Sequence, residues 1–451
     1  MSTEQFVWEP QPAAAGLVRE LQEEALAGCA FARELAERMT AETGTRFVDW
    51  LDSIVVPAGR GLEPRLIETG FTPESLPGAP SCYIHHGGLF PKIVIEERGS
   101  LQIAIKVESV SDFLSTHRLH DASIRGGEGM PLRVARVACE GQYEMWVVER
   151  HGDHGFEPHQ ADAEVVSKMA HHRDAIRRRP RTLGEDEGFR AAQSLVEAAV
   201  RDLGQDVASD LWFWCERDEW QRRNHAARVQ YGRQQALGLG WANHDHHTYR
   251  SSREHYTKLI KLLETVGMSC RERFYAGEEA GWGAQVLEQF RTGFVVFADV
   301  DMEPEEVAGD FAHDGFGEKP EMGTVGLWCA LHGDSAVGAG MHHLECQFDW
   351  HALKQQLETE AGISTMAPFT TFPFLRQAFT EGERWAVDPA RVDALLAGGQ
   401  ITPAQAEAFR TEGAVGSHLE NLERNDGYKG FNQTGVSDII SRTDPRKLAE
   451  V

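Results

Sequence analysis

Three histidines and an arginine fall within the segment NHDHHTYR (243–250). We predict a β-strand here, in which alternate side chains point the same way, so that His244, His246 and Arg250 share one face while His247 lies on the other. Imidazole nitrogen is a frequent ligand of iron, zinc and copper ions. One face of this strand is therefore a candidate metal site, and a solvated polar turn is the alternative interpretation.

A second strand with histidines is predicted in GMHHLECQFDW (340–350). Alternation places His343 and Glu345 on one face and apolar residues on the other, which must pack on a helix. The polar face is then turned toward a cavity, which costs free energy unless its groups bind something. In the last strand, HLENLER (418–424), Glu420 offers a carboxylate. Two histidines and one carboxylate form the set that holds iron(II) on one face and leaves positions open for substrate and oxygen.

The two histidine strands open two similar units. After 244–250, the apolar periodicity of SSREHYTKLIKLLETVG predicts a helix, with Ser251 and Glu254 as a capping box and Gly267 at its end. Strands are then predicted at RERFYA, GAQVLEQ, GFVVFADV and VGLWCAL. The pattern restarts with 340–350 as a strand, followed by the helix WHALKQQLETEAG.

The whole chain is predicted to be an α+β protein with three parts. Residues 1–160 carry leading helices, a loop-rich passage and short β-rich runs; residues 161–239 form a helical connector; and residues 240–451 hold the histidine strands. A helical insertion is predicted over 365–412, and we expect it to close over the site. Insertions of this kind usually cover the mouth of a site or a neighbouring subunit, so a homodimer is an open alternative.

Two stretches carry a family resemblance. AGMHHLECQFDWHALKQQLETEAGI resembles the strand and helix with the second metal histidine in 4-hydroxyphenylpyruvate dioxygenase, a vicinal oxygen chelate protein, and HLENLERNDGYKGFNQTGVSDII is similar to that enzyme's closing strand and C-terminal helix. The resemblance implies paired βαβββ modules that form a half-barrel around a metal. It assigns the metal ligands to His246, His343 and Glu420, while His244 and His247 are expected not to bind the metal.

The spacing His246-x-x-x-Arg250 is similar to the metal histidine and carboxylate-binding arginine of the 2-oxoadipate dioxygenase/decarboxylase group. This resemblance implies that Arg250 binds a substrate carboxylate, for which a planar guanidinium is suited; an arginine paired with an acidic neighbour is the alternative. The implied function is a mononuclear non-heme iron(II) dioxygenase that uses O2 to decarboxylate a small 2-oxo acid oxidatively. Mn²⁺, Zn²⁺ and Co²⁺ are the alternative metals.

The N-terminal half is predicted to be a degenerate copy of the same module. WVVERHGDHGF (146–156) echoes NLERNDGYKGF (421–431), with Glu-Arg before and Gly-Phe after. Trp146 stands where Glu420 would be, and the matching opening strand, LQIAIKVES, has no histidine. We therefore expect no metal in residues 1–160.

Three other functions compete with the dioxygenase. His244-x-His246 is also the HxH signature of metallohydrolase barrels, although such a barrel needs alternating strand-helix units and an HxH near its start. A lyase or isomerase of the same fold would use a divalent metal to polarise a substrate carbonyl. A non-catalytic binding module is the third.

Composition narrows the class of protein further. The formal charge of −25 disfavours nucleic acid as a partner, since phosphates would be repelled. The seven cysteines form no CxxC pair, so neither a zinc ribbon nor a disulfide framework is expected. The first residues do not resemble a leader, and no apolar run reaches the roughly eighteen residues of a membrane span. We therefore expect a cytoplasmic protein with no membrane contact.

Overall fold

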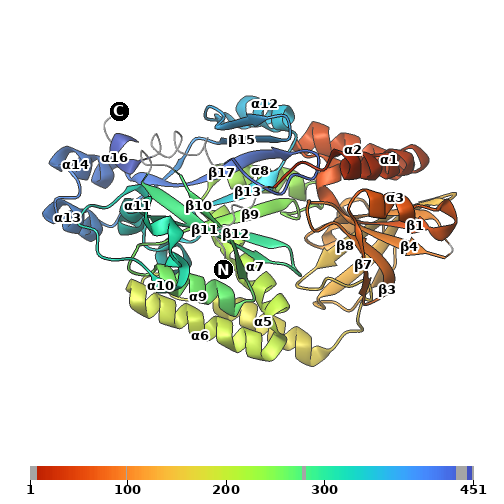
Figure 1. The fold of residues 1–451 in the computed structure, drawn as a ribbon, viewed down its shortest axis with the longest axis horizontal. Helices are drawn as coiled ribbons and strands as arrows, with labels where there is room; N and C mark the ends of the chain where they lie inside the picture. Colours follow the sequence, from red (N-terminus) through yellow and green to blue (C-terminus); the bar gives the residue numbers. More distant parts are fainter. Residues whose placement is uncertain (1–7, 98, 277–280, 433–443, 449–451) are drawn as a thin grey trace.

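The computed structural model describes residues 8–97, 99–276, 281–432 and 444–448. Two β-sheets lie side by side along the long axis of the molecule, the N-terminal one in red to orange and the C-terminal one in green to blue (Figure 1). No helix in this described part of the chain is long and apolar enough to cross a membrane. The C-terminal helix implied by the resemblance falls mostly on residues outside the described ranges.

The N-terminal sheet contains two βαβββ units. Its strand order is β2-β3-β4-β1-β5-β8-β7-β6. Within the units β1 is parallel to β4 and β5 is parallel to β8, and the units join where β1 runs antiparallel to β5. The elements are β1 Leu51–Pro57, α3 Glu63–Glu68, β2 Thr72–Leu76, β3 Ala79–Ile84, β4 Lys92–Glu96, β5 Leu101–Lys106, α4 Val110–Thr116, β6 Ile124–Arg125, β7 Leu132–Glu140 and β8 Tyr143–Arg150.

The C-terminal sheet repeats this plan. Its order is β10-β11-β12-β9-β13-β17-β15-β14, with β9 parallel to β12, β13 parallel to β17, and β9 antiparallel to β13 at the join. A short strand, β16, pairs with β17 off this path. The elements are β9 His244–Arg250, α9 Tyr256–Thr265, β10 Ser269–Tyr275, β11 Trp282–Gln289, β12 Phe294–Asp301, β13 His343–Gln347, α12 Trp350–Ala361, β14 Thr370–Phe372, β15 Leu375–Phe379, β16 Glu383–Trp385 and β17 Ala414–Arg424.

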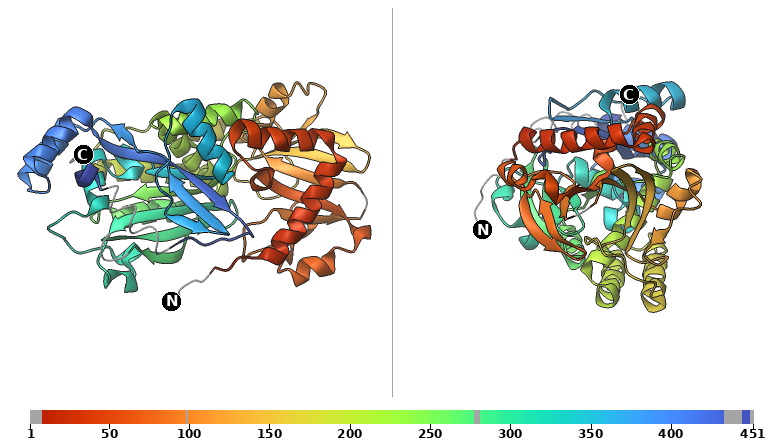
Figure 2. Two further views of the ribbon diagram at one scale, coloured as in Figure 1. Left: turned by 90° about the horizontal axis from the view of Figure 1, so that it is seen from above. Right: turned by 90° about the vertical axis from the view of Figure 1, so that its right-hand side faces the viewer.

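Helices cover one face of each sheet. α1 (Pro12–Gly28) and α2 (Ala30–Thr43) pack on the N-terminal sheet and are drawn in red in Figure 2. The connector forms α5 Ala163–Arg177, α6 Glu185–Leu203, α7 Gln205–Arg222 and α8 His225–Gln235. Together with α9 and α12, helices α6 and α7 share one apolar core with the C-terminal sheet. The opposite face of that sheet is left to line a cavity.

Side chains alternate between the two faces of β13 as predicted. Leu344 and Cys346 lie in the same core cluster as Leu353 and Leu357 of α12, whereas His343 and Glu345 line the cavity. The helix ends as predicted, with Gly362 in the left-handed conformation (φ 64°) that glycine adopts without steric cost.

Several predicted elements are wrong. VGLWCAL is not a strand but the core of α11 (Thr324–His332), a buried apolar run whose periodicity fits either structure. The passage predicted as loop before residue 80 contains β1, β2 and β3, whose prolines lie near strand ends or at an edge of the sheet. The predicted capping box at α9 does not form, because Ser251 Oγ and the Ser252 N–H both donate to Asp334 Oδ1, at 2.6 and 2.7 Å.

The predicted helical insertion is partly wrong as well. Residues 370–372 and 375–379 are β14 and β15, strands that complete the second C-terminal unit. Only α13 (Pro389–Ala397) and α14 (Pro403–Glu412, which begins with a capping box at Thr402) are helical additions. These two helices lie at the end of the molecule (Figure 1) and pack on α11, so they do not close over the cavity.

Candidate metal centre

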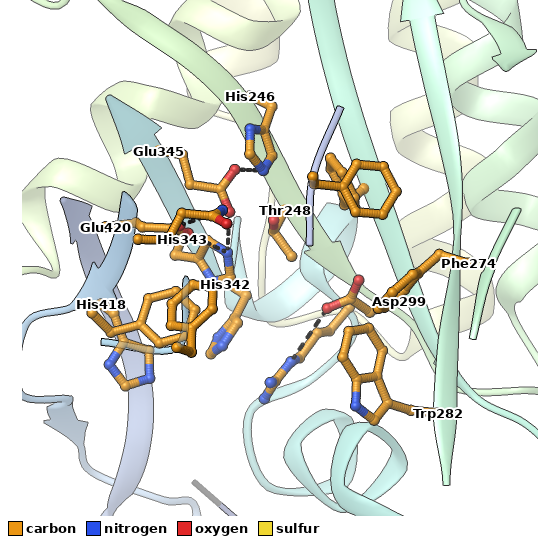
Figure 3. A pocket seen from close by; sticks show the side chains of 16 residues that line it. His246, Thr248, Phe274, Trp282, Asp299, His342, His343, Glu345, His418 and Glu420 are labelled. Atoms are coloured by element: carbon orange, nitrogen blue, oxygen red, sulfur yellow. Dashed lines mark hydrogen bonds and ion pairs between the residues drawn. The ribbon is translucent and has the colours of Figure 1, made fainter. Parts of the chain in front are cut away.

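A cavity of about 60 Å³ lies against the face of the C-terminal sheet opposite to α6, α7, α9 and α12 (Figure 3). Its wall contains the three ligands assigned from the sequence, His246 on β9, His343 on β13 and Glu420 on β17, and also Glu345 and Arg250. The strands that carry them are adjacent in the sheet order β9-β13-β17. Adjacent strands therefore bring distant parts of the chain to one cavity.

Glu345 lies among the three predicted ligands. His343 Nε2 is 2.8 Å from Glu345 Oε1 and 3.8 Å from Glu420 Oε2, and His246 Nε2 contacts Glu345 Oε2. Ligand atoms of His343, Glu345 and Glu420 all lie within 4.8 Å of one another. Strand alternation predicts Glu345 on the cavity face, but the predicted ligand set leaves it out. The register of β13 against its neighbours, His246↔Glu345↔Glu420, puts it at the centre.

His244 does not share the face of His246. The pairing of β9 with β13 matches Glu345 with His246 and Cys346 with His244, which leaves Asp245 as the extra residue of a β-bulge. The bulge reverses the alternation, so the ring of His244 stacks on Phe294, with centroids 5.3 Å apart. The sequence prediction for the face of His244 is therefore wrong, and the HxH pair of a metallohydrolase does not converge on one point.

His247 lies on the opposite face of β9 from His246, as predicted. Its Nε2 is 3.2 Å from Arg217 Nη1 of α7, within the helix-covered core. His246 and Thr248 point the other way and line the cavity. Alternation along β9 is therefore regular beyond the bulge.

Asp245 orients the ring of His246. Its Oδ1 accepts a hydrogen bond from His246 Nδ1 (2.8 Å), and Arg424 donates to both carboxylate oxygens at 2.9 and 3.0 Å. Burial alone would raise the pKa of Asp245, but Arg424 and His246 hold it below its usual range. The ionised carboxylate keeps the proton of His246 on Nδ1, so that the lone pair of Nε2 faces the carboxylate cluster, the arrangement found in many metal-binding histidines.

Glu420 is held by a polar partner on the neighbouring strand. Gln377 Nε2 on β15 donates to Glu420 Oε1 at 3.0 Å. Burial raises the pKa of Glu420 well above its ordinary value, and it lowers the pKa of His343 well below its own and that of His246 to about 4. Neutral imidazoles offer their lone pairs to a cation, and a bound divalent cation favours the ionised carboxylate.

The donor set fits a divalent metal. Imidazole nitrogens and carboxylate oxygens are the ligands that iron(II), manganese(II) and zinc(II) accept, and buried groups of this kind are rarely left without partners. Glu345 Oε2 is buried and is opposed by His246 Nε2 without a regular hydrogen bond, and His343 Nδ1 is buried and makes no hydrogen bond to any described residue. A cation between His246, His343, Glu345 and Glu420 would satisfy the carboxylates.

Phe297 closes the opposite side of the cluster. In each C-terminal unit, the residue two positions after the candidate histidine pairs with the last strand of the unit: Glu345 with Glu420, and Thr248 with Phe297. Phe297 is thus the counterpart of Glu420 and offers no ligand. Its ring lies 4.5 Å from that of His246, centroid to centroid. The candidate ligands therefore lie on β9, β13 and β17, and β12 contributes an aromatic ring beside them in place of a fourth-strand ligand.

The four phenylalanines of residues 369–379 lie in two settings. Phe369 and Phe379 line the cavity, with ring centroids 4.8 Å apart. Phe372 and Phe374 pack on each other and on Tyr428, outside it.

The N-terminal half repeats the framework without the ligands. Arg150 donates to both carboxylate oxygens of Asp52, at 2.6 and 2.9 Å, and to two carbonyls of the following turn, just as Arg424 does around Asp245. That this half binds no metal remains a prediction, supported by the residue types found there. By register, Ser53, Gln102, Ala104 and Trp146 occupy the positions of His246, His343, Glu345 and Glu420.

The Asp245→Asn variant is expected to weaken metal binding roughly 10- to 100-fold, the usual effect of removing an outer partner of a ligand histidine. The measurement is metal affinity by competition with a chelator. Asp52→Asn is the matched control, because it breaks the same kind of buried Asp–Arg pair in the half without ligands. Equal affinity in the two variants would contradict the role of Asp245.

Neither a scan against protein-family models nor a search of curated proteins finds a match for this chain. A search of solved structures finds weak likenesses. A variant of 4-hydroxymandelate synthase from Streptomyces coelicolor is 11% identical, with a TM-score of 0.26, over 89% of this chain and 98% of that one. The Mn(II)-bound glyoxalase from Novosphingobium aromaticivorans is 8% identical, with a TM-score of 0.19, over 83% and 82%. A variant of homoprotocatechuate 2,3-dioxygenase from B. fuscum is 10% identical, with a TM-score of 0.20, over 86% and 76%.

The strand order and pairing of this chain stand independently of the low scores. Four βαβββ units are joined two by two, each pair meeting through an antiparallel contact of its opening strands. The chain therefore has the vicinal oxygen chelate fold, built from two paired modules of which the C-terminal one carries the candidate metal centre.

Proposed function

We propose that this protein is a mononuclear non-heme iron(II) dioxygenase that decarboxylates a compact 2-oxo acid oxidatively. The observation that carries the proposal is the convergence of His246, His343 and Glu420 from three adjacent strands on one cavity whose far wall is aromatic. When bound there, iron(II) supplies redox chemistry with O2 and open positions for a chelating acid. Mn²⁺, Zn²⁺ and Co²⁺ are the alternative ions.

The residues of the chain have distinct parts in this proposal. Asp245 and Gln377 hold His246 and Glu420 in place, and Arg250 binds a carboxylate of the substrate. Phe297 and the neighbouring rings exclude water, which protects a reactive site from side reactions. Electrons for the reduction of O2 come from the 2-oxo acid, whose bond between the keto carbon and the carboxylate breaks to release CO2. One oxygen atom enters the carboxylate formed at the former keto carbon and the other hydroxylates a carbon of the same acid, so no separate reductant is needed.

A divalent-metal lyase or isomerase of the same fold is the second candidate. Glu345 favours it, because a fourth ligand would fill a position that O2 needs, and a buried carboxylate beside a metal-bound carbonyl is suited to moving a proton. In the dioxygenase proposal, Glu345 instead turns away from the metal when the substrate binds.

One experiment separates the two. The protein is purified without oxygen, its metal content is measured, and it is mixed with a panel of 2-oxo acids before oxygen is admitted. The dioxygenase proposal expects iron, and CO2 release equal to the O2 consumed. Turnover of an acid without oxygen, with zinc or manganese bound, would reject it in favour of the second candidate.

A further inference from the structure

Arg250 and Asp299 form an incomplete ion pair in the wall of the cavity, where Figure 3 labels Asp299. They face each other in register on β9 and β12, yet Arg250 Nε lies 4.0 Å from Asp299 Oδ2, beyond hydrogen-bond distance. Each residue is only 3% exposed. Within the described ranges, neither side chain makes a hydrogen bond, and Arg250 Nε is fully buried.

Neighbouring charges do not complete the pair. Asp301 already accepts backbone N–H groups at the start of α11, at 2.9 and 2.8 Å, and Asp444 is paired with Arg446 at 2.9 Å. The Arg250 guanidinium also lies over the ring of Trp328, 5.5 Å from its centroid. Buried polar and charged groups without hydrogen bonds are costly and rare, so these two side chains point to a ligand that supplies the missing bonds.

The pair is separate from the metal ligands. Arg250 is four residues along β9 from His246, about 13 Å between Cα atoms in a strand. Figure 3 shows Asp299 beside Trp282, away from the cluster of Glu345, His343 and Glu420. A substrate that binds the metal at one end would therefore reach Arg250 and Asp299 with its other end.

We propose that Arg250 and Asp299 together recognise the end of the substrate that lies away from the metal, and that this end carries a carboxylate beside a hydroxyl group. The carboxylate accepts from the Arg250 guanidinium, and the hydroxyl bonds to the Asp299 carboxyl. A 2-hydroxy acid presents these two groups on neighbouring atoms, which suits partners 4.0 Å apart. This inference rests on the proposed function for the metal-bound end only.

A hydroxyl group suits Asp299 better than an ammonium group. Burial raises the pKa of Asp299 to about 8 against the opposing pull of Arg250. Near neutral pH the carboxyl is then mostly protonated, and it can both donate to and accept from a hydroxyl. An ammonium group would require the ionised carboxylate and would bring a second cation beside Arg250.

The test compares acids that differ in one group. Succinate, malate and aspartate carry hydrogen, hydroxyl and ammonium at the same carbon, and glutarate, 2-hydroxyglutarate and glutamate form the matching five-carbon series. Binding is measured by calorimetry on the protein as purified and again after chelator treatment, because hydroxy acids also bind metals. We expect the hydroxy acid of one series to bind roughly tenfold more tightly than its unsubstituted partner, the effect of one hydrogen bond to a buried group.

Two variants locate the preference. Asp299→Leu keeps the branched shape of the side chain but cannot form a hydrogen bond, so the hydroxy acid and its unsubstituted partner should bind about equally. Asp299→Asn can still bond a hydroxyl and should keep most of the preference. Metal content and melting temperature show that both variants are folded. A preference unchanged in Asp299→Leu, tighter binding of the amino acid, or no binding of either series would overturn the inference.

The result of this binding test does not depend on the oxygen chemistry of the proposed function. Binding is measured without oxygen or turnover, so a hydroxyl preference together with failure to release CO2 would reject the dioxygenase and keep the recognition pair. CO2 release without any preference for the hydroxy acid would keep the dioxygenase and reject the recognition pair.

Discussion

His343→Ala is expected to lower iron affinity more than roughly 100-fold, beyond the effect of losing an outer partner of a ligand. His343 is the residue whose Nε2 lies within 3.8 Å of both candidate carboxylates, and its ring has no other hydrogen-bond partner among the described residues. Its loss leaves one imidazole and two carboxylates, a harder and weaker set for iron(II). The measurement is metal content after dialysis against iron(II), with affinity taken from chelator competition.

His244→Gln is the control. Its ring stacks on Phe294 outside the cavity, so the metal content should stay unchanged. Full metal content in His343→Ala would contradict the assignment and direct attention to Glu264, Cys270 and His313, an exposed group that could also hold an ion.

Arg250→Lys is expected to raise KM for the best 2-oxo acid roughly 10- to 100-fold while metal content stays unchanged. A lysine keeps the charge but cannot reproduce the two parallel hydrogen bonds of a guanidinium, and the substitution removes a buried ligand contact worth about 1.5–3 kcal/mol. The measurement is kcat and KM for the acid with the highest turnover.

The control for this variant is a measurement of its melting temperature. Arg250 also packs over the ring of Trp328, so a structural role would lower the melting temperature without a selective effect on KM. Unchanged kinetics in a folded, metal-loaded variant would show that Arg250 does not contact the substrate. A KM effect that disappears for acids without a second carboxylate would place the contact at the far end of the substrate.

Much of the candidate site follows from local alternation. A strand turns every second side chain to the same face, so the order of residues in β13 is enough to separate His343 and Glu345 from Leu344 and Cys346. The capping sequence at Thr402 similarly identifies the start of α14. Features of this kind depend on neighbours within a few residues, and such neighbours are visible in the sequence.

Local patterns fail where packing chooses between two structures. VGLWCAL is apolar at nearly every position, and such a run suits a buried strand or a buried helix equally. It is helical because Leu327 and Leu331 face α13 and α14 while Val325 and Trp328 face the sheet side. The predicted face of His244 is wrong because a β-bulge at Asp245 depends on the partner strand, not on β9 itself.

The sequence by itself determined which side chains could bind a metal and which face of each strand would carry them, because both follow from residue type and the period of the strand. Tertiary structure alone decided that β9, β13 and β17 are adjacent, that Glu345 stands between His246 and Glu420, and that Asp299 meets Arg250. The physical reason is that strand order and register arise from hydrogen bonds between segments far apart in the chain. Those bonds are chosen by the burial of the whole sheet against its helices and leave no local mark in the sequence.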